Sequence, residues 1–207
     1  MAAGEDRRSF FHCPACGLVF VPEAHWLTVE QERERYAHHD NRASNAGYRR
    51  FLGQVADVVV GLAAGHSTIP PKVLPRTLDF GSGENAVLTC LLRERGLPCV
   101  AYDPLYTDDP SPLRQRYDIV VVCEVIEHLR QLRQELMTMQ QCLNPGAPIV
   151  VRTRCYPSVA GITSWWYARD TTHINFFSEQ ALDFAARLCG RRSQRTLEPD
   201  IFIWAAA

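Results

Sequence analysis

The carboxyl-terminal part of this sequence alternates short, continuous apolar runs with amphipathic stretches. Such runs are typical of strands that are buried on both faces of a parallel sheet. The stretches between them repeat apolar residues at a helical period, and helices are the usual connection between parallel strands. The pattern therefore predicts an α/β fold with a mostly parallel sheet. The apolar runs lie within TLDF (77–80), LPCVAYD (97–103), YDIVVVC (117–123) and LNPGAPIVVRT (143–153).

The end of the chain breaks this alternation. The segment RRSQRTLEPDIFIWA (191–205) reads as two strands on either side of a Glu-Pro-Asp turn. Consecutive strands joined by a short turn pair antiparallel. We therefore expect a terminal antiparallel hairpin on the otherwise parallel sheet.

The amino-terminal part has a different organisation. FFHCPACGLVFV (10–21) places a Cys-x-x-Cys turn between two apolar runs, the sequence form of a zinc knuckle on a hairpin. Thr28 and Gln31 have the spacing of a capping box, and residues 48–62 repeat apolar positions as a second helix would. The proline-rich stretch 66–76 is a linker. We accordingly predict an amino-terminal knuckle with a helical cap over residues 1–70 and a second domain over residues 71–207.

Composition and charge exclude several functions. The formal net charge is −1, so no global field attracts the chain to nucleic acid or to an anionic membrane. The single lysine, Lys72, follows two prolines and no glycine-rich loop, which argues against a Schiff-base lysine and a Walker phosphate loop. No apolar run approaches the ~20 residues of a spanning helix, and the start of the chain lacks the apolar core of a secretion signal. We therefore expect a cytoplasmic protein with reduced cysteines.

A glycine-rich loop follows the first apolar run of the second domain. Asp79 closes this run, and Gly81 and Gly83 lead into a helix. Glycines allow the backbone to approach a ligand closely, and a helix start attracts anionic groups. Asp103 ends the next run, where a carboxylate can accept hydrogen bonds from ribose hydroxyls. The order of these features predicts an adenosine-containing cofactor.

Two types of adenosine cofactor are compatible with this loop. Gly81, Gly83 and Ala86 also satisfy the G-x-G-x-x-A spacing of a nicotinamide-binding turn. The part of the chain from Leu78 to the end suffices for the cofactor sheet but not for a separate substrate domain. An NAD-dependent oxidoreductase is therefore the weaker alternative.

Taken in order, LDFGSGENAVL, VAYDP, YDIVVVCEVIEHL and LNPGAPIVV resemble the motifs of class I S-adenosylmethionine-dependent methyltransferases of the small-molecule type. The resemblance covers about residues 76–207 and implies a Rossmann-like domain. It implies that Gly81 and Gly83 approach the methionine part of the cofactor, that Asp79 supports the loop and helps to hold the amino group, and that Asp103 binds the ribose. It further implies that Pro104 and Leu105 lie against the adenine. The wall near the sulfonium would be formed by Cys123, Glu124 and Val125.

The sequence departs from this family at two places. Asn85 stands where a third glycine is usual, which affects the shape of the loop. The stretch 104–116, between Asp103 and Tyr117, is too short for the usual helix and third strand. We therefore expect a shortened third-strand region, in which Asp108 or Asp109 would have to replace the usual adenine-contacting acid.

Candidate catalytic residues lie after the later strands. A positioned base assists methyl transfer to a hydroxyl or a protonated amine, and histidine titrates near neutrality. His128 follows the YDIVVVC run, and His173 lies beside Tyr167 and Asp170. The surrounding aromatic residues are either a lid over the acceptor or a satellite core. We also expect the amino-terminal helices to cover the acceptor site and to contribute Tyr36, Tyr48 or Arg49. The aromatic residues concerned are Trp165, Trp166, Tyr167, Phe176 and Phe177.

Cys13 and Cys16 need further ligands to form a zinc site. His38 is our candidate for a third ligand, and His12, His25 and His39 are others, but the sequence has no second Cys pair. A redox pair and a vestigial knuckle are competing interpretations.

The sequence thus predicts an S-adenosylmethionine-dependent methyltransferase with a small-molecule acceptor. One alternative is a protein that modifies RNA or DNA, with Arg191, Arg192 and Arg195 contacting phosphates. Another is a cofactor-binding protein without catalysis. The methyl-accepting atom and the oligomeric state are left open.

Overall fold

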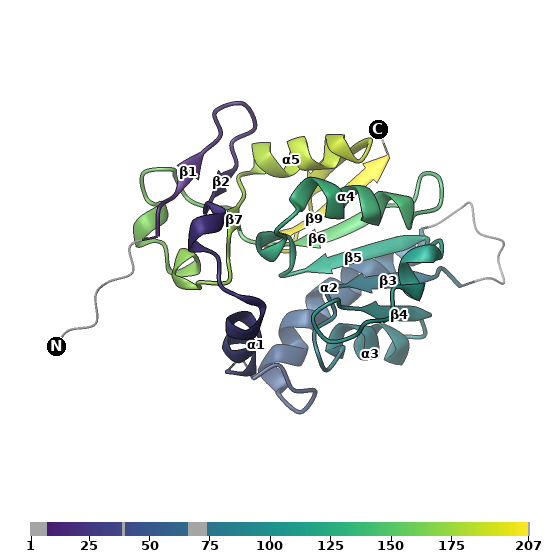
Figure 1. Ribbon diagram of the computed structural model, residues 1–207. Coiled ribbons are helices and arrows are strands. Elements are labelled where there is room, and N and C mark those ends of the chain that lie inside the picture. Colours follow the sequence, from purple (N-terminus) through teal and green to yellow (C-terminus); the bar gives the residue numbers. More distant parts are fainter. Residues whose placement is uncertain (1–7, 39, 66–73, 207) are drawn as a thin grey trace.

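The computed structural model of the chain describes residues 8–38, 40–65 and 74–206, so most of the predicted linker, Lys72 and His39 lie outside the described residues (Figure 1). The main sheet consists of β3 (Thr77–Phe80), β4 (Cys99–Tyr102), β5 (Ile119–Cys123), β6 (Ile149–Arg152), β8 (Arg191–Arg195) and β9 (Ile201–Ala206). The smaller sheet consists of β1 (Phe11–His12), β2 (Val19–Phe20) and β7 (Asn175–Phe176). The α-helices are α1 (Val29–Ala37), α2 (Ala46–Ala64), α3 (Val87–Glu94), α4 (Leu132–Gln141) and α5 (Glu179–Leu188).

The main sheet has the strand order β4-β3-β5-β6-β9-β8. The first four strands of this order are parallel, and β9 is antiparallel to both of its neighbours. Helices α2 and α3 cover one face and α4 and α5 cover the other (Figure 1). The α/β fold with a mostly parallel sheet and a terminal antiparallel hairpin is thereby confirmed.

Strand β5 shows why its sequence is continuously apolar. Ile119 and Val121 pack with α2 and α3, whereas Val120 and Val122 pack with α4 and α5. Successive side chains of a strand point to opposite faces, so a strand covered on both sides buries every residue. The same alternation brings Trp204 of β9, which is fully buried, into the core below α4 and α5.

Strand β4 is the outermost strand at one edge of the main sheet, and the connection from β4 to β5 is short, as expected. The structure describes the whole stretch between β4 and β5, which forms the 3₁₀ helix η2 (Ser111–Arg114) and contains no third strand. The shortened third-strand region is thus confirmed.

The amino-terminal segments pack onto the rest of the chain in two places. The predicted hairpin forms as β1 and β2, and β2 pairs antiparallel with β7, which lies far along the chain. Helix α1 begins with the predicted capping box of Thr28 and Gln31. Helix α2 buries Leu52, Val55 and Val59 against α3 and the main sheet. The boundary near residue 70 stays a prediction. In the described part of the chain, the helices are too short or too polar to cross a membrane.

A buried carboxyl group joins β3 to α3. Asp79 is 2% exposed, and its Oδ2 accepts a hydrogen bond from Thr89 Oγ1 at 2.8 Å. Burial disfavours the charged form and raises the pKa of Asp79 to about 6. The folded protein therefore binds a proton here more tightly than the unfolded chain does.

We predict that Asp79→Asn stabilises the protein at pH 8 but not at pH 4. An acid with a raised folded-state pKa destabilises the fold as pH rises from its ordinary value through the raised one, and an amide stays neutral throughout. The gain at pH 8 should be on the order of 2–3 kcal/mol, because one pKa unit corresponds to about 1.4 kcal/mol.

Urea unfolding of both proteins at pH 4, 6 and 8 measures this difference. Asp108→Asn, at an exposed position, is the matched control and should change little at any pH. A destabilisation by Asp79→Asn that is equal at all three pH values would contradict the explanation.

Candidate active site

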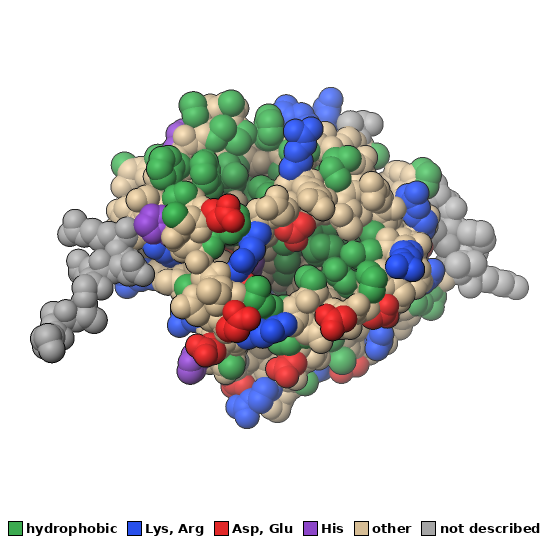
Figure 2. Space-filling view, in the orientation of Figure 1, with side chains coloured by type: hydrophobic (Ala, Val, Ile, Leu, Met, Phe, Trp, Pro, Cys, Tyr) green, Lys and Arg blue, Asp and Glu red, His purple; other side chains and the backbone are tan. Residues whose placement is uncertain are grey.

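A large cleft opens at the carboxyl ends of β3, β4 and β5. Its volume is about 1290 Å³. The chain passes from β3 to β4 on one side of the sheet and then crosses to β5 on the other side of β3. Ligands of open α/β sheets bind at such a switch point, because the loops after the two neighbouring strands diverge there. Figure 2 shows a hollow near the middle of this face, with charged side chains of both signs around it.

The glycine loop after β3 forms one wall of the cleft. Gly81 has φ +80°, and a Cβ placed there would lie 2.4 Å from Val125 Cγ2. Gly83 has φ +69°, but a Cβ there would meet nothing within 4 Å. Gly81 is thus required by backbone conformation and by close packing, whereas Gly83 leaves open space beside the loop.

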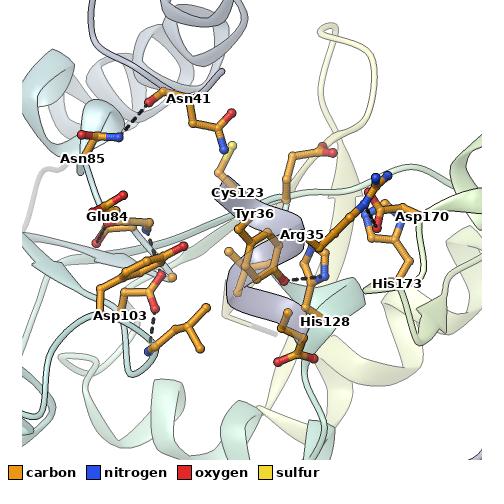
Figure 3. A pocket seen from close by; sticks show the side chains of 18 of the residues that line it. Arg35, Tyr36, Asn41, Glu84, Asn85, Asp103, Cys123, His128, Asp170 and His173 are labelled. Carbon is orange, nitrogen blue, oxygen red and sulfur yellow. Dashed lines mark hydrogen bonds and ion pairs between the residues drawn. The ribbon is translucent and has the colours of Figure 1, made fainter. Parts of the chain in front are cut away.

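Asp103 faces this loop from the end of β4. Its Oδ2 accepts a hydrogen bond from Gly83 N, and its Oδ1 accepts one from Leu105 N, both at 2.9 Å (Figure 3). Burial raises the pKa of Asp103 above its ordinary value. A carboxylate has about four lone-pair positions, so each oxygen retains one for a ligand.

Most of the predicted cofactor-binding residues line the cleft. They are Gly81, Gly83, Asp103, Pro104, Leu105, Cys123, Glu124 and Val125. Asp79 does not, because its side chain points beneath the loop to Thr89. Its supporting role fits this position, but direct contact with the amino group of a cofactor does not.

Asp108 and Asp109 also lie outside the lining of the cleft. Asn85 Nδ2 donates to the backbone oxygen of Asn41 at 3.4 Å and links the loop to the segment before α2.

Two carboxyl groups lie on either side of Tyr167 at the far end of the cleft. The hydroxyl oxygen of Tyr167 is 3.2 Å from Glu124 Oε2 and makes a shorter contact with Glu127 Oε1. Burial raises the pKa of both glutamates, and their mutual repulsion adds to the effect at Glu124. Glu127 is fully buried and its Oε2 accepts from Thr153 Oγ1 at 3.0 Å. The hydroxyl group of Tyr167 thus joins the two glutamates in one group, and its single proton is donated to one of them at a time.

His128 and His173 lie next to this group. Their ring centroids are 4.7 Å apart. Nδ1 of His128 is 3.0 Å from the backbone oxygen of Thr172, and Nδ1 of His173 is 2.8 Å from that of Tyr167. A carbonyl oxygen only accepts hydrogen bonds, so both Nδ1 atoms carry the hydrogen. Burial lowers the pKa of both histidines, to about 3 for His173. Both rings are therefore neutral, with the lone pair on Nε2.

Helix α1 closes the cleft from the side of the amino terminus. Tyr36 Oη lies 3.0 Å from His128 Nδ1, and Arg35 forms an ion pair with Asp170 at 3.3 Å (Figure 3). Burial alone would raise the pKa of Asp170, but hydrogen bonds from Thr172 and Arg35 outweigh it and hold the pKa well below its ordinary value. Tyr48 of α2 also lines the cleft, whereas Arg49 forms an ion pair with Glu94 and does not.

The structure brings together all four predicted catalytic residues. His128, Tyr167, Asp170 and His173 line the same end of the cleft. The aromatic residues for which a lid or a satellite core was expected lie in two kinds of surroundings. Trp166 lines the cleft and is 58% exposed, but the other members of the segment pack in hydrophobic cores. Those buried or packed members are Trp165, Phe176 and Phe177, together with the ring of Tyr167.

The predicted zinc ligands do not come together. Cys13 and Cys16 lie in the turn of the β1–β2 hairpin, while His38 lies at the end of α1 and lines the cleft. Among the residues that the structure describes, one group of three metal-ligand side chains has suitably close donor atoms, and it consists of Glu127, His128 and His173. The hairpin therefore lacks a third ligand from the described residues, and its shape alone does not support zinc.

Of the three arginines proposed to contact nucleic acid, Arg192 is exposed and the other two are engaged elsewhere. Arg191 is 7% exposed and donates to the backbone oxygens of Ala147 and Cys189. Arg195 forms an ion pair with Glu179 at 2.6 Å. These contacts give no support to a phosphate-binding surface at this hairpin.

Sequence reasoning missed two features of the site. One is Glu127, which follows a strand within an apolar stretch and gives no sign of its burial beside Tyr167. The other is the contact between Gly81 and Val125, which joins two loops that are distant in the sequence. The Glu-His pair of YDIVVVCEVIEHL was the only local signal for the first.

Comparisons with solved structures give the same fold. An O-methyltransferase family protein from Burkholderia thailandensis has a TM-score of 0.53 at 13% identity, with 84% of this chain and 62% of that chain covered. Mitomycin 7-O-methyltransferase has a TM-score of 0.55 at 14% identity, with 85% and 57% covered. This chain therefore spans less than two thirds of the length of those two proteins.

A third similar structure matches over nearly its whole length. It is the 1,6-didemethyltoxoflavin-N1-methyltransferase of Burkholderia thailandensis, with bound 1,6-didemethyltoxoflavin and S-adenosylhomocysteine. The TM-score is 0.53 at 16% identity, and 94% of this chain and 97% of that chain are covered. Identities this low show a shared fold.

The sequence was also compared with curated proteins and with family models. No curated protein matches it. A family model described as a methyltransferase domain matches residues 31–190. Since this match spans most of the chain, the chain belongs to that methyltransferase domain family.

Proposed function

We propose that this methyltransferase uses S-adenosylmethionine and transfers its methyl group to a small-molecule acceptor. The observation that carries the proposal is the pairing of Gly83 with Asp103 at the switch point of the sheet. This pairing places an open glycine backbone and a carboxylate with free lone pairs side by side. An adenosyl cofactor needs this combination for its ribose and its amino-acid tail.

The cleft has the size and shape that such a cofactor needs. A Cβ at Gly83 would enter open space, so the loop leaves room for a ligand against its backbone. Pro104 and Leu105 provide apolar surface next to Asp103 for a flat base. The volume of about 1290 Å³ exceeds the ~300–1,000 Å³ of ordinary ligand pockets, so a second ligand can bind beside the first.

When bound, S-adenosylmethionine supplies a methyl group already activated on a sulfonium. The remaining task of the chain is to hold an acceptor in line and to keep water out. Cys123, Glu124 and Val125 form the wall between the two ends of the cleft, and Glu124 meets Tyr167 across it. We assign His128, Tyr167, Asp170 and His173 to the acceptor end, where they hold and orient the acceptor.

A small acceptor is favoured over a macromolecule by the walls of this end. Helix α1 closes it through Tyr36 and Arg35, and Trp166 stands at its margin. The similar N1-methyltransferase that matches over its whole length is a structure with a small heterocyclic molecule bound. A space bounded on these sides suits a small molecule.

Calorimetric titration with S-adenosylhomocysteine, S-adenosylmethionine and NADH tests the proposal. We expect micromolar or tighter binding of the two adenosyl ligands and no binding of NADH. Binding of NADH alone would favour the oxidoreductase alternative and overturn the proposal.

We predict that Gly81→Ala abolishes binding of S-adenosylhomocysteine. The added Cβ would collide with Val125 and push the loop away from its position, in addition to about 1–2 kcal/mol for the left-handed backbone. Gly96→Ala is the matched control, because Gly96 has φ +85° but open space around it, outside the cleft. Both variants should lose stability, and only Gly81→Ala should lose the ligand. Equal binding by the two variants, measured by calorimetry, would refute this role of Gly81.

We predict that Asp103→Asn weakens binding of S-adenosylhomocysteine by about tenfold or more. A hydrogen bond to a charged group contributes roughly 1.5–3 kcal/mol, and about 1.4 kcal/mol is a factor of ten in affinity. Asp109→Asn serves as the control, since Asp109 bonds to Ser111 outside the cleft. Unchanged affinity in Asp103→Asn, measured by the same titration, would remove Asp103 from the binding site.

A further inference from the structure

Two loops that are distant in sequence are locked together at the acceptor end. Glu127 and His128 lie in the 3₁₀ turn η3 (Ile126–His128) after β5, and His173 precedes β7. Ile174 N donates to the backbone oxygen of Glu127 at 2.9 Å, and Asn175 Nδ2 donates to that of Leu129 at 2.7 Å. These bonds hold together the two backbone segments that carry the three side chains.

We propose that Glu127, His128 and His173 bind a divalent transition-metal ion at the acceptor end of the cleft. One donor atom of each side chain lies within 4.8 Å of the other two. Bonds of about 2.0–2.2 Å at tetrahedral angles place donor atoms about 3.3–3.6 Å apart. The donor atoms must therefore approach one another by up to about 1.5 Å to complete the site.

Both imidazoles make the backbone hydrogen bond that is usual for a metal-binding histidine. A histidine that binds a metal through one nitrogen usually donates its other N–H to a backbone carbonyl or a carboxylate. His128 and His173 do this through Nδ1, toward Thr172 O and Tyr167 O. The lone pair on each Nε2 is left for an ion. This assignment refines the roles that the sequence suggested for the two histidines, from proton acceptors to ligands.

The carboxylate is held in the same manner. Tyr167 Oη and Thr153 Oγ1 each bond to a different oxygen of Glu127. Each carboxylate oxygen has two lone pairs, so one on each remains for an ion. Tyr167 thus supports two of the three ligands, Glu127 with its hydroxyl group and His173 with its carbonyl oxygen.

The donor set selects the class of ion. Two imidazoles and one carboxylate suit Zn²⁺, Fe²⁺ or Co²⁺, whereas Mg²⁺ and Ca²⁺ prefer sites built from oxygen alone. His128 and His173 line the cleft, while Glu127 is buried behind them. The remaining coordination positions therefore face the space that the proposed function assigns to the acceptor, and this part of the inference rests on that function.

Metal content and Co²⁺ spectroscopy of the full chain, purified without a histidine tag, test the site. After treatment with a chelator, the wild-type protein should bind one Zn²⁺ per chain. Co²⁺ should give visible d–d bands without the intense near-ultraviolet band of a thiolate complex. His128→Ala and His173→Ala should each lose stoichiometric binding, and the Cys13→Ser, Cys16→Ser double variant should retain it. Zn²⁺ that is retained in the histidine variants, or that is lost in the cysteine variant, would overturn the proposal.

Tyr167→Phe keeps the test decisive if a histidine variant does not fold. It removes only the hydroxyl group that bonds to Glu127, and loss of such a support should weaken Zn²⁺ binding roughly 10- to 100-fold. Unchanged Zn²⁺ affinity in this variant counts against the site.

Titration of the metal-free protein with S-adenosylhomocysteine separates the two proposals. Binding of S-adenosylhomocysteine by a protein that binds no Zn²⁺ would overturn the metal site and leave the methyltransferase proposal in place. Binding of Zn²⁺ without S-adenosylhomocysteine would support the metal site and overturn the proposed function.

Discussion

The close packing of Gly81 against Val125 is the constraint on which the rest of the site depends. It brings the loop after β3 against the loop after β5, where the two neighbouring strands of the sheet diverge. A side chain at Gly81 would occupy the space of the Val125 methyl groups, so the two loops would have to separate. Their contact places Gly83 beside Asp103 on one side and Glu124 beside Tyr167 on the other. The absence of a side chain at Gly81 thus allows the loops after β3 and β5 to lie in contact between the two ends of the cleft.

The two walls of the acceptor end are held by different kinds of interaction. A backbone hydrogen bond from Ile174 N to the oxygen of Glu127 joins η3 to the segment before β7, and β7 in turn pairs with β2 of the amino-terminal hairpin. The hairpin therefore supports the segment that carries His173, whatever its cysteines bind. Helix α1, on the opposite wall, has no buried residues and contacts the cleft through Tyr36 and Arg35. Ion pairs and single hydrogen bonds of this kind contribute less than a packed apolar face.

The sequence predicted the parts of this molecule that depend on local pattern. Apolar runs gave the main sheet, the spacing of Thr28 and Gln31 gave the start of α1, and the glycine loop with Asp103 gave one end of the cleft. The parts it did not predict depend on contacts between distant segments. The pairing of β2 with β7 and the meeting of Glu127 with Tyr167 leave no periodic trace in either segment. The same limit explains why His38 was wrongly expected beside Cys13 and Cys16. His38 lies at the end of α1 and lines the cleft, away from the turn of the hairpin.

The polar cluster at the acceptor end is costly for the fold. Placing the fully buried Glu127 beside the partly buried Glu124 withdraws carboxyl oxygens from water, and apolar side chains of similar volume would satisfy the core at lower cost. Hydrogen bonds from Tyr167 and Thr153 offset only part of that cost, and Glu124 Oε1 has no hydrogen-bond partner among the described residues. This cost lies beside the cleft, and the core below α2 and α3 contains one further buried carboxyl group, that of Asp79. A ligand that forms hydrogen bonds or ion pairs with the carboxyl groups of Glu124 and Glu127 would offset the free-energy cost of their burial. The burial that destabilises the fold at the acceptor end therefore favours the binding of a ligand there.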